Sequence, residues 1–299
     1  ICFEKKYDLV HCHSPIGGVL ARLAAKRTGG VGCRVIYTAH GFHFYEGGSK
    51  KSWLLFYPIE RICSRFTDVL ITINEEDYKI AKRNFKAGKV VKIPGVGVDT
   101  EKFKKSISVE GNIKKRKEIG VPEDAIMILS VGELNNNKNH QLVIRTMTKL
   151  LNKEIHYVIV GVGSKREELE KLANKLNVSD RVHFLGYRKD IVELNNCADL
   201  FAFPSIREGL GMASLEALSC GVPVVGMNTR GIKEYVKEGI SGCLFENDVD
   251  DCKRAIELAL KMLKNKSLSS EKCREMALKY SFEKTNKIML RVYKQFSDK

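Results

Sequence analysis

The 299-residue sequence lacks any long apolar run. No stretch approaches the roughly 20 apolar residues that a membrane-spanning helix needs. The first residues also lack the charged segment, apolar segment and cleavage pattern of a secretory signal. From these absences we expect neither a membrane span nor a secretory leader.

Cysteine is present but never in a paired pattern. The nine cysteines are odd in number and scattered, and no two of them form a C-x-x-C. This distribution argues against both a disulfide framework and a zinc site. We expect reduced cysteines and a cytoplasmic protein. From the net charge, described next, we also expect the protein to lie at the inner face of the cytoplasmic membrane.

Motifs for nucleic-acid recognition are also lacking, although the chain is basic. It has 51 Lys and Arg against 36 Asp and Glu, a formal net charge of +15. The basic clusters at 114–117 and 82–83 have no interleaved aromatic residues that would stack on bases. We therefore expect no nucleic-acid partner and attribute the charge to an anionic membrane or a pyrophosphate-lipid substrate.

The segment Ser49–Arg65 combines the only tryptophan with large apolar residues and basic residues at both ends. That mixture is typical of a helix that lies on an anionic membrane surface. In the alternative interpretation, Trp53, Phe56 and Ile59 pack into the domain. Both interpretations stay open at this point.

Short apolar runs alternate with helical spacing along the whole chain, the pattern of parallel sheets covered on both faces. Apolar periodicity fades between Thr100 and Gly120, where lysines dominate, which indicates either a linker or a polar surface helix. We predict an α/β fold with two Rossmann-like domains at 1–105 and 121–280, a linker at 106–120 and a C-terminal helical segment at 281–299. The candidate strands are 8–13, 34–38, 68–73, 90–93, 126–131, 156–160, 181–185, 199–203 and 222–225.

The most informative motif lies where one of these strands meets a helix. The apolar run Asp199–Ser205 is followed by glycines at 209 and 211 and by helical spacing that stops at Gly221. A helix start with adjacent glycines can bind an anion, since its free amides and dipole favour negative charge. Two acids, Glu208 and Glu216, flank this turn.

The spacing of these acids predicts an elongated ligand. On one helix they would lie about 12 Å apart along the axis and about 80° apart around it. That exceeds the roughly 5 to 9.5 Å of a glycosidase carboxylate pair. A ligand with hydroxyls at both ends and a diphosphate between them, such as a nucleotide diphosphate sugar, fits the spacing.

The stretch from Phe203 to Val224, with its two acids in E-x7-E spacing, resembles the retaining glycosyltransferases of family 4, which have the GT-B fold. The resemblance, of the capsular or exopolysaccharide type, implies two domains that face each other across a cleft. Glu208 then contacts the donor sugar and Glu216 holds the ribose hydroxyls. The amides of Gly209, Leu210, Gly211 and Met212 meet the diphosphate.

Further segments match the same family pattern. Gly132, Glu133 and Lys138 follow the strand at 126–131, where the family shows a glycine, an arginine and a lysine that grips the diphosphate. Glu133 replaces that arginine, so the diphosphate must depend more on Lys138, on helix amides or on Arg207.

The resemblance also implies contacts to the rest of the donor. Gly161 lies in the nucleotide-side turn, although such turns serve tight packing as often as phosphate. Tyr187 and Arg188 are candidate contacts to the base. His40 faces the sugar and the diphosphate, and we count it with Glu208 and Lys138 as catalytic. The family pattern also implies that the opening part of the first domain precedes Ile1, so we expect a truncated first domain.

A metal site of the D-x-D type has the letters Asp248, Asp250 and Asp251 available. These acids precede the helical segment 255–263, where acids at a helix start serve as N-cap and first-turn groups. We therefore expect no metal and no cofactor.

We predict a retaining, metal-independent glycosyltransferase. It moves a sugar from a nucleotide diphosphate donor, a UDP sugar, to a hydroxyl of a lipid-linked or polysaccharide acceptor. Two alternatives remain, a GT-B sugar-nucleotide epimerase and a non-catalytic sugar-nucleotide-binding fragment. The identity of the sugar, the acceptor and the oligomeric state are not predicted.

Overall fold

The computed structural model describes residues 7–27 and 33–296 and divides the chain into two compact units. Unit 1 comprises residues 1–97 and 282–299, and unit 2 comprises residues 98–281. Ile1 and Cys2, and with them the expected truncation, lie outside the described residues.

The segment at 106–120 contains a polar helix, the second of the two expected alternatives, rather than a linker. Residues Val109–Glu118 form helix α4, which packs against α7 (Ile191–Cys197) within unit 2. The physical reason is Arg116, a buried residue of α4 that donates to the main-chain carbonyls of Ala125 and Cys197. The boundary between the units therefore lies at 97/98 rather than at 105.

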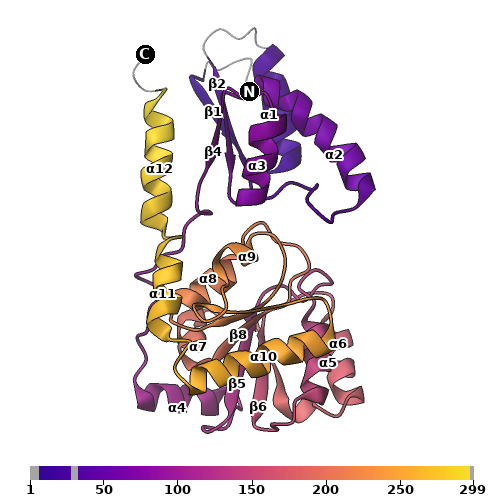
Figure 1. Cartoon of the computed structure of the whole chain (residues 1–299), viewed down its shortest axis with the longest axis vertical. Helices are drawn as coiled ribbons and strands as arrows, with labels where there is room; N and C mark the ends of the chain where they lie inside the picture. Colours follow the sequence, from indigo (N-terminus) through magenta and orange to yellow (C-terminus); the bar gives the residue numbers. More distant parts are fainter. Residues whose placement is uncertain (1–6, 28–32, 297–299) are drawn as a thin grey trace. The chain divides into compact units, whose positions relative to one another are not determined.

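Unit 1 contains a parallel sheet in the order β1-β2-β3-β4 (Figure 1). One face of this sheet is buried by α1, α2 and α3 around a cluster that includes Tyr37, Phe44 and Leu70. Tyr293 of α12 contacts His11 on the other face, where its hydroxyl lies 2.7 Å from Nδ1. The elements are β1 (Leu9–Cys12), α1 (Pro15–Arg27), β2 (Arg34–Ala39), α2 (Lys50–Cys63), β3 (Val69–Thr72), α3 (Glu75–Asn84), β4 (Lys89–Lys92) and α12 (Phe282–Lys294).

Unit 2 contains a parallel sheet in the order β10-β9-β8-β5-β6-β7. Its strands are β5 (Ile126–Val131), β6 (Ile155–Val160), β7 (Val182–Gly186), β8 (Leu200–Phe203), β9 (Val224–Met227) and β10 (Gly242–Phe245). The strand order reverses between β5 and β8, which makes this pair the switch point of a doubly wound sheet.

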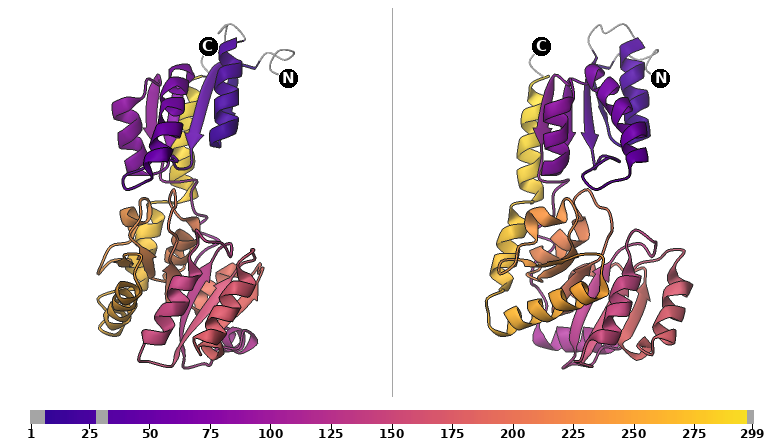
Figure 2. Two further views of the ribbon diagram at one scale, coloured as in Figure 1. Left: turned by 90° about the vertical axis from the view of Figure 1, so that its right-hand side faces the viewer. Right: turned by 45° about the vertical axis from the view of Figure 1, so that its right-hand side comes forward.

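Helices cover both faces of this second sheet (Figure 2). On one face α5, α6 and α10 bury a cluster that includes Ile128, Tyr157 and Phe245. On the other, α8 packs against α11, and α4 against α7. The helices not yet bounded are α5 (His140–Lys149), α6 (Arg166–Lys175), α8 (Met212–Ser219), α9 (Ile232–Tyr235), α10 (Val249–Lys264) and α11 (Ser270–Leu278).

The predicted α/β class and the parallel sheets are confirmed, and the nine predicted strands agree with β1 to β9 apart from their ends. The tenth strand, β10, was not predicted. It is short, and its first residue, Gly242, comes so close to β9 that a Cβ atom there would lie 1.8 Å from the Val224 carbonyl oxygen. In the sequence, a glycine before three apolar residues looks like a turn.

Candidate functional site

The candidate site lies at the carboxyl ends of β5 and β8, the two strands at the switch point of unit 2. Ligands of doubly wound sheets bind in this crevice because the loops after the two strands diverge there. The loop after β5 contains Gly132, Glu133 and Lys138, and the loop after β8 contains Arg207 and Glu208. The fold thus brings together residues about seventy positions apart in the sequence.

Asn137 ties these two loops together with three hydrogen bonds. Its main-chain carbonyl accepts from the Ile206 amide at 2.8 Å. Its side-chain oxygen accepts from the Arg207 amide at 3.1 Å, and its side-chain nitrogen donates to the Arg207 carbonyl at 3.0 Å. The main chain beside Lys138 is therefore fixed against the main chain beside Glu208. Asn137 was not predicted from the sequence, because a loop asparagine does not indicate its hydrogen-bond partner.

Lys138 and Glu208 form an ion pair, with Nζ 2.5 Å from Oε1. Both side chains are partly buried, and Nζ lies 5.3 Å from the centre of the Phe203 ring. The Lys138 amide also donates to the Asn135 side-chain oxygen at 2.9 Å. The side chain expected to bind the diphosphate and the side chain expected to bind the sugar are thus in direct contact.

The helix after this loop begins at a glycine that cannot cap it. Gly211, the N-cap of α8, has φ +87°, and a Cβ atom there would lie 2.8 Å from the Phe203 ring. Without a capping side chain, the first amides of α8 are left for solvent or a ligand. Glu208 precedes the helix and Glu216 lies on it, so the two acids are not on one helix as the 12 Å estimate assumed.

Burial changes the chemistry of Glu216. It lies with Met212 and Ala213 on the less buried side of α8, and burial raises the pKa of its carboxyl to about 7, although Lys102 acts in the opposite direction. This carboxyl therefore titrates near neutral pH. A carboxylate that must be held in a desolvated position is typical of a binding site.

Gly161 is explained by packing alone. It has φ +149°, and a Cβ atom there would lie 1.9 Å from the Gly132 carbonyl oxygen. The loop after β6 is joined to the loop after β5 by Leu134, whose amide donates to the Val162 carbonyl at 3.0 Å. A side chain at 161 would separate the two loops, so this glycine needs no phosphate to account for it.

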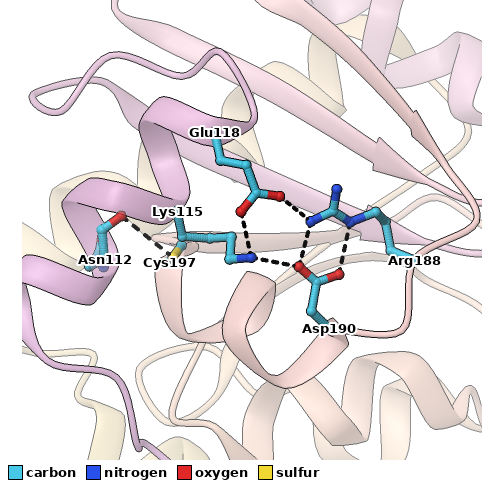
Figure 3. A network of polar contacts seen from close by, with 6 residues as sticks. All are labelled: Asn112, Lys115, Glu118, Arg188, Asp190 and Cys197. Atoms are coloured by element: carbon cyan, nitrogen blue, oxygen red, sulfur yellow. Dashed lines mark hydrogen bonds and ion pairs between the residues drawn. The ribbon is translucent and has the colours of Figure 1, made fainter.

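The two candidate base contacts differ in their surroundings, and Figure 3 shows those of Arg188. Tyr187 is exposed at the end of β7. Arg188 is held by two carboxylates, with Nη2 2.5 Å from both Asp190 and Glu118, and Lys115 is 2.8 Å from the same two acids. Hydrogen bonds from Arg188, the larger effect, and from Lys115 hold the pKa of Asp190 below its usual range. Arg188 therefore anchors the loop that carries Tyr187.

A further cation near the site was not identified from the sequence. Arg230 is buried in the loop after β9, and its Nε donates to the Glu208 carbonyl at 3.3 Å. Its signal in the sequence would have been a cation after the strand next to β8. Arg207 is exposed, while the carboxylate of Glu133 accepts from Asn135 within its own loop at 2.9 Å.

His40 belongs to unit 1, just after β2. Its Nε2 lies 3.0 Å from Nδ1 of His13, which follows β1. Burial, and secondly the neighbouring His13, lower the pKa of His40. The fold thus places two neighbouring histidines at the carboxyl end of the first sheet.

The acids of the D-x-D letters are used locally, as predicted. The Asp248 side chain accepts from the amides of Asp250 and Asp251 and caps α10. Asp250 pairs with Lys149, and Asp251 with an arginine of its own helix. Among residues 7–27 and 33–296, no group of three or more His, Cys, Asp or Glu has the arrangement of a metal site. No helix in those ranges is long and apolar enough to cross a membrane.

The eight cysteines that the structure describes are all free. Seven of them are buried, and Cys33 is partly exposed. The predicted absence of a disulfide framework therefore holds for this part of the chain.

Solved structures with the same fold were found by comparison. A structure of Anabaena HepE in complex with UDP matches with a TM-score of 0.84 over 98% of this chain and 80% of that chain, at 20% identity. WaaG, a glycosyltransferase involved in lipopolysaccharide biosynthesis, matches with a TM-score of 0.72 over 91% of this chain and 80% of that chain, also at 20% identity. These matches show the GT-B fold.

Two curated relatives share more of the sequence. EpsD of Bacillus subtilis, whose name assigns it to the glycosyltransferases, is 40% identical over 98% of this chain and 78% of its own length. An Escherichia coli UDP-Gal:alpha-D-GlcNAc-diphosphoundecaprenol alpha-1,3-galactosyltransferase is 34% identical over 83% of this chain and 65% of its own length.

Family models match both parts of the sequence. The family described as Glycosyltransferase Family 4 matches residues 1–102. The family described as Glycosyl transferases group 1 matches residues 112–279, more than half of the chain, and includes every candidate residue of unit 2. The chain therefore belongs to the group 1 glycosyltransferases, enzymes of the GT-B fold.

Proposed function

We propose that this glycosyltransferase transfers a sugar with retention from a UDP sugar to a hydroxyl of a lipid-linked or polysaccharide acceptor. The observation that carries the proposal is the contact of Lys138 with Glu208 at the switch point of unit 2. Glu216 lies on α8, the helix that follows Glu208. A cation for a diphosphate and acids for hydroxyls at both ends match the parts of a nucleotide diphosphate sugar.

Two comparisons support UDP as the nucleotide and a lipid as the acceptor carrier. Anabaena HepE was solved with UDP and with UDP-glucose. The Escherichia coli relative is named for a UDP-Gal donor and a diphosphoundecaprenol acceptor. The two curated relatives are named as a putative glycosyltransferase and as a galactosyltransferase, so neither an epimerase nor a non-catalytic fragment is favoured.

In the proposed mechanism, the acceptor hydroxyl attacks the anomeric carbon on the face from which the diphosphate leaves. The bond from the anomeric carbon to the diphosphate oxygen breaks, and the hydroxyl proton passes to that departing diphosphate. Lys138 and the first amides of α8 stabilise the charge of the leaving diphosphate, which is the main catalytic contribution. Glu208 orients the sugar and Glu216 the ribose. Tyr187 contacts the base, and His40 is a further candidate catalytic residue.

No metal is part of this mechanism. Lys138 and helix amides take the role that a divalent cation has in D-x-D enzymes, and Asp248, Asp250 and Asp251 are engaged at α10.

To test the proposal, UDP release can be measured with a panel of UDP sugars and acceptor lipids in vesicles. We expect release with at least one donor only when acceptor is present. Interconversion of a UDP sugar without transfer would contradict the proposal and favour an epimerase.

We further propose that the enzyme works in the cytoplasm on the inner membrane face and touches anionic lipid through α2. Trp53 and Phe56 pack inward, and the Trp53 indole donates to the Tyr45 carbonyl at 3.0 Å. Ile59 is exposed, in contrast to the packing interpretation, and so are Leu54, Leu55 and Ile62, which are 82%, 58% and 55% exposed.

The charges of α2 fit the same contact. Four cations, at 50, 51, 61 and 65, are exposed on or next to the helix. The one acid of α2, Glu60, is buried and paired with Arg22 at 2.9 Å. The outer side of the helix is therefore apolar and basic, as an anionic bilayer surface requires.

Sedimentation with vesicles tests this contact. The chain should bind vesicles rich in anionic lipid and bind zwitterionic vesicles weakly, and L54S/L55S should reduce the binding. Leu151, which is 84% exposed in unit 2, supplies the matched control L151S. Equal binding by all three proteins would contradict the assignment of α2.

A further inference from the structure

The ion pair joins Lys138, the proposed partner of the donor diphosphate, to Glu208, the proposed partner of the donor sugar. Glu208 therefore competes with a diphosphate for Lys138. Nζ and Oε1 are 2.5 Å apart, so each charge already has a partner. Both side chains are partly buried, and Nζ of Lys138 lies 5.3 Å from the centre of the Phe203 ring. Such a pair is screened less by water and salt than an exposed one. A phosphate that binds Lys138 must therefore take the lysine from Glu208.

The pair is fixed by the fold of both loops. Asn137 bonds to Ile206 and Arg207 hold the two main chains together. On the other side, Arg230 donates to the Glu208 carbonyl. Because the main chain on both sides is held, a ligand can separate the two side chains but cannot easily separate the two loops.

The consequence differs for a nucleotide with and without a sugar. A UDP sugar that binds Lys138 through its diphosphate offers hydroxyl donors to the Glu208 carboxylate. UDP offers none, so Glu208 is left unpaired next to the negative charge of the diphosphate. An unpaired, partly desolvated carboxylate near like charge is costly.

We infer that Glu208 determines specificity for the sugar-bearing donor over UDP, and that it favours the release of UDP after transfer. This inference rests on the proposed function, since it takes the donor to be a UDP sugar. Once the sugar has left, Glu208 returns to Lys138 and competes with the product for it. A side chain that contacted only the sugar would have no effect on the affinity for UDP.

Titration calorimetry with UDP, UDP-glucose and UDP-galactose tests the inference on the wild type and on Glu208→Gln. The amide keeps the shape of the side chain but removes its charge. We expect the Kd for UDP to fall about tenfold, equivalent to about 1.4 kcal/mol. The affinity for the bound UDP sugar should change less, so its advantage over UDP should shrink.

A second variant of Glu208, a double variant and a control complete the test. Glu208→Ala should also bind UDP more tightly than the wild type, and it serves if the amide variant fails to fold. In a Lys138→Ala background, Glu208→Gln should improve UDP binding by a smaller factor, because the competition is already gone. Glu154→Gln removes an exposed carboxylate at the amino end of β6, opposite to the carboxyl ends of the strands that form the site, and should leave the affinity for UDP unchanged.

Two failures are distinguishable. If Glu208→Gln and Glu208→Ala bind UDP as the wild type does, or more weakly, the inference is wrong while the proposed donor stands. If the wild type binds neither UDP nor any of the UDP sugars, the proposed function is wrong.

Discussion

Glu216 is the residue whose ionisation the fold changes most directly at the candidate site. Burial raises its pKa to about 7. The charge of Lys102 favours ionisation but has a smaller effect than burial. A pair of ribose hydroxyls would donate hydrogen bonds to the carboxylate. We therefore propose that a bound nucleotide offsets part of the free-energy cost of burying the charge of Glu216.

The first prediction concerns the loss of this carboxylate. Glu216→Ala should weaken UDP binding by about 1.5 to 3 kcal/mol, the range for hydrogen bonds to a charged group. The variant should bind UDP and 2′,3′-dideoxy-UDP almost equally, whereas the wild type should prefer UDP. Titration calorimetry measures both ligands, and a wild type without preference would assign the ribose to another residue.

The second prediction is the pH dependence of UDP binding. Because the pKa of Glu216 is raised to about 7, the carboxyl is ionised above that pH and protonated below it. The affinity for UDP should therefore fall as the pH is lowered from 8 to 6. A terminal phosphate also titrates near pH 6, so the test is the difference from Glu216→Gln, whose affinity should change less. Parallel profiles would show that Glu216 does not contribute.

At the scale of elements, the loops after β5 and β8 act as one piece because Asn137 joins them. The strands provide the edge, but these hydrogen bonds set the position of Lys138 relative to Glu208. A displacement of about 1 Å at such a site is expected to slow the reaction by about a hundredfold.

The third prediction follows from this joint. Asn137→Ala removes the two side-chain hydrogen bonds to Arg207 and keeps the main-chain bond to Ile206. We expect the transfer rate to fall about ten- to a hundredfold, with a loss of stability of only about 1 to 2 kcal/mol. The neighbouring, exposed Asn136 provides the control. Equal rates for both alanine variants would show that the joint does not position the site.

The sequence was sufficient for β1 to β9 and for the glycine turn before α8, because apolar runs of strand length and glycines are local signals. It was insufficient for β10, whose strand character comes from its pairing with β9. Asn137 and the four-charge network at Arg188 join segments 70 or more residues apart, and one sequence does not show such partners. The roles of the site residues stay predictions.

The fourth prediction concerns β6 and β7, whose histidines contact each other. His156 Nδ1 is 2.8 Å from His183 Nε2, and burial, with a smaller effect of His156, lowers the pKa of His183 to about 4. This pKa lies below the unfolded value, so the contribution to stability is complete above about pH 6.5 and is lost as the pH falls toward 4.

Denaturant unfolding between pH 7 and 5 measures this effect. The free energy of unfolding should fall by up to about 1.4 kcal/mol per pH unit from His183 alone. His183→Gln should show a shallower fall. An unchanged slope in the variant would mean that the pKa of His183 is not lowered in the native protein.

At the scale of the whole molecule, the chain consists of two α/β units, each built on a sheet of parallel strands. Family models match a region in each half of the sequence. Composition and alternating strands were sufficient to predict the two units. The sequence did not give their boundary, because the lysine-rich segment at 109–118 is a polar helix rather than a linker. A charged helix and a linker share the same loss of apolar periodicity.

The fifth prediction is the stereochemical outcome, and proton NMR of the product tests the central claim most directly. The reaction is run with an α-linked UDP sugar, a lipid-linked acceptor and EDTA. We predict turnover without metal and a product whose anomeric proton signal is that of an α-linkage. A β-configured product, or turnover that requires a divalent cation, would contradict this prediction.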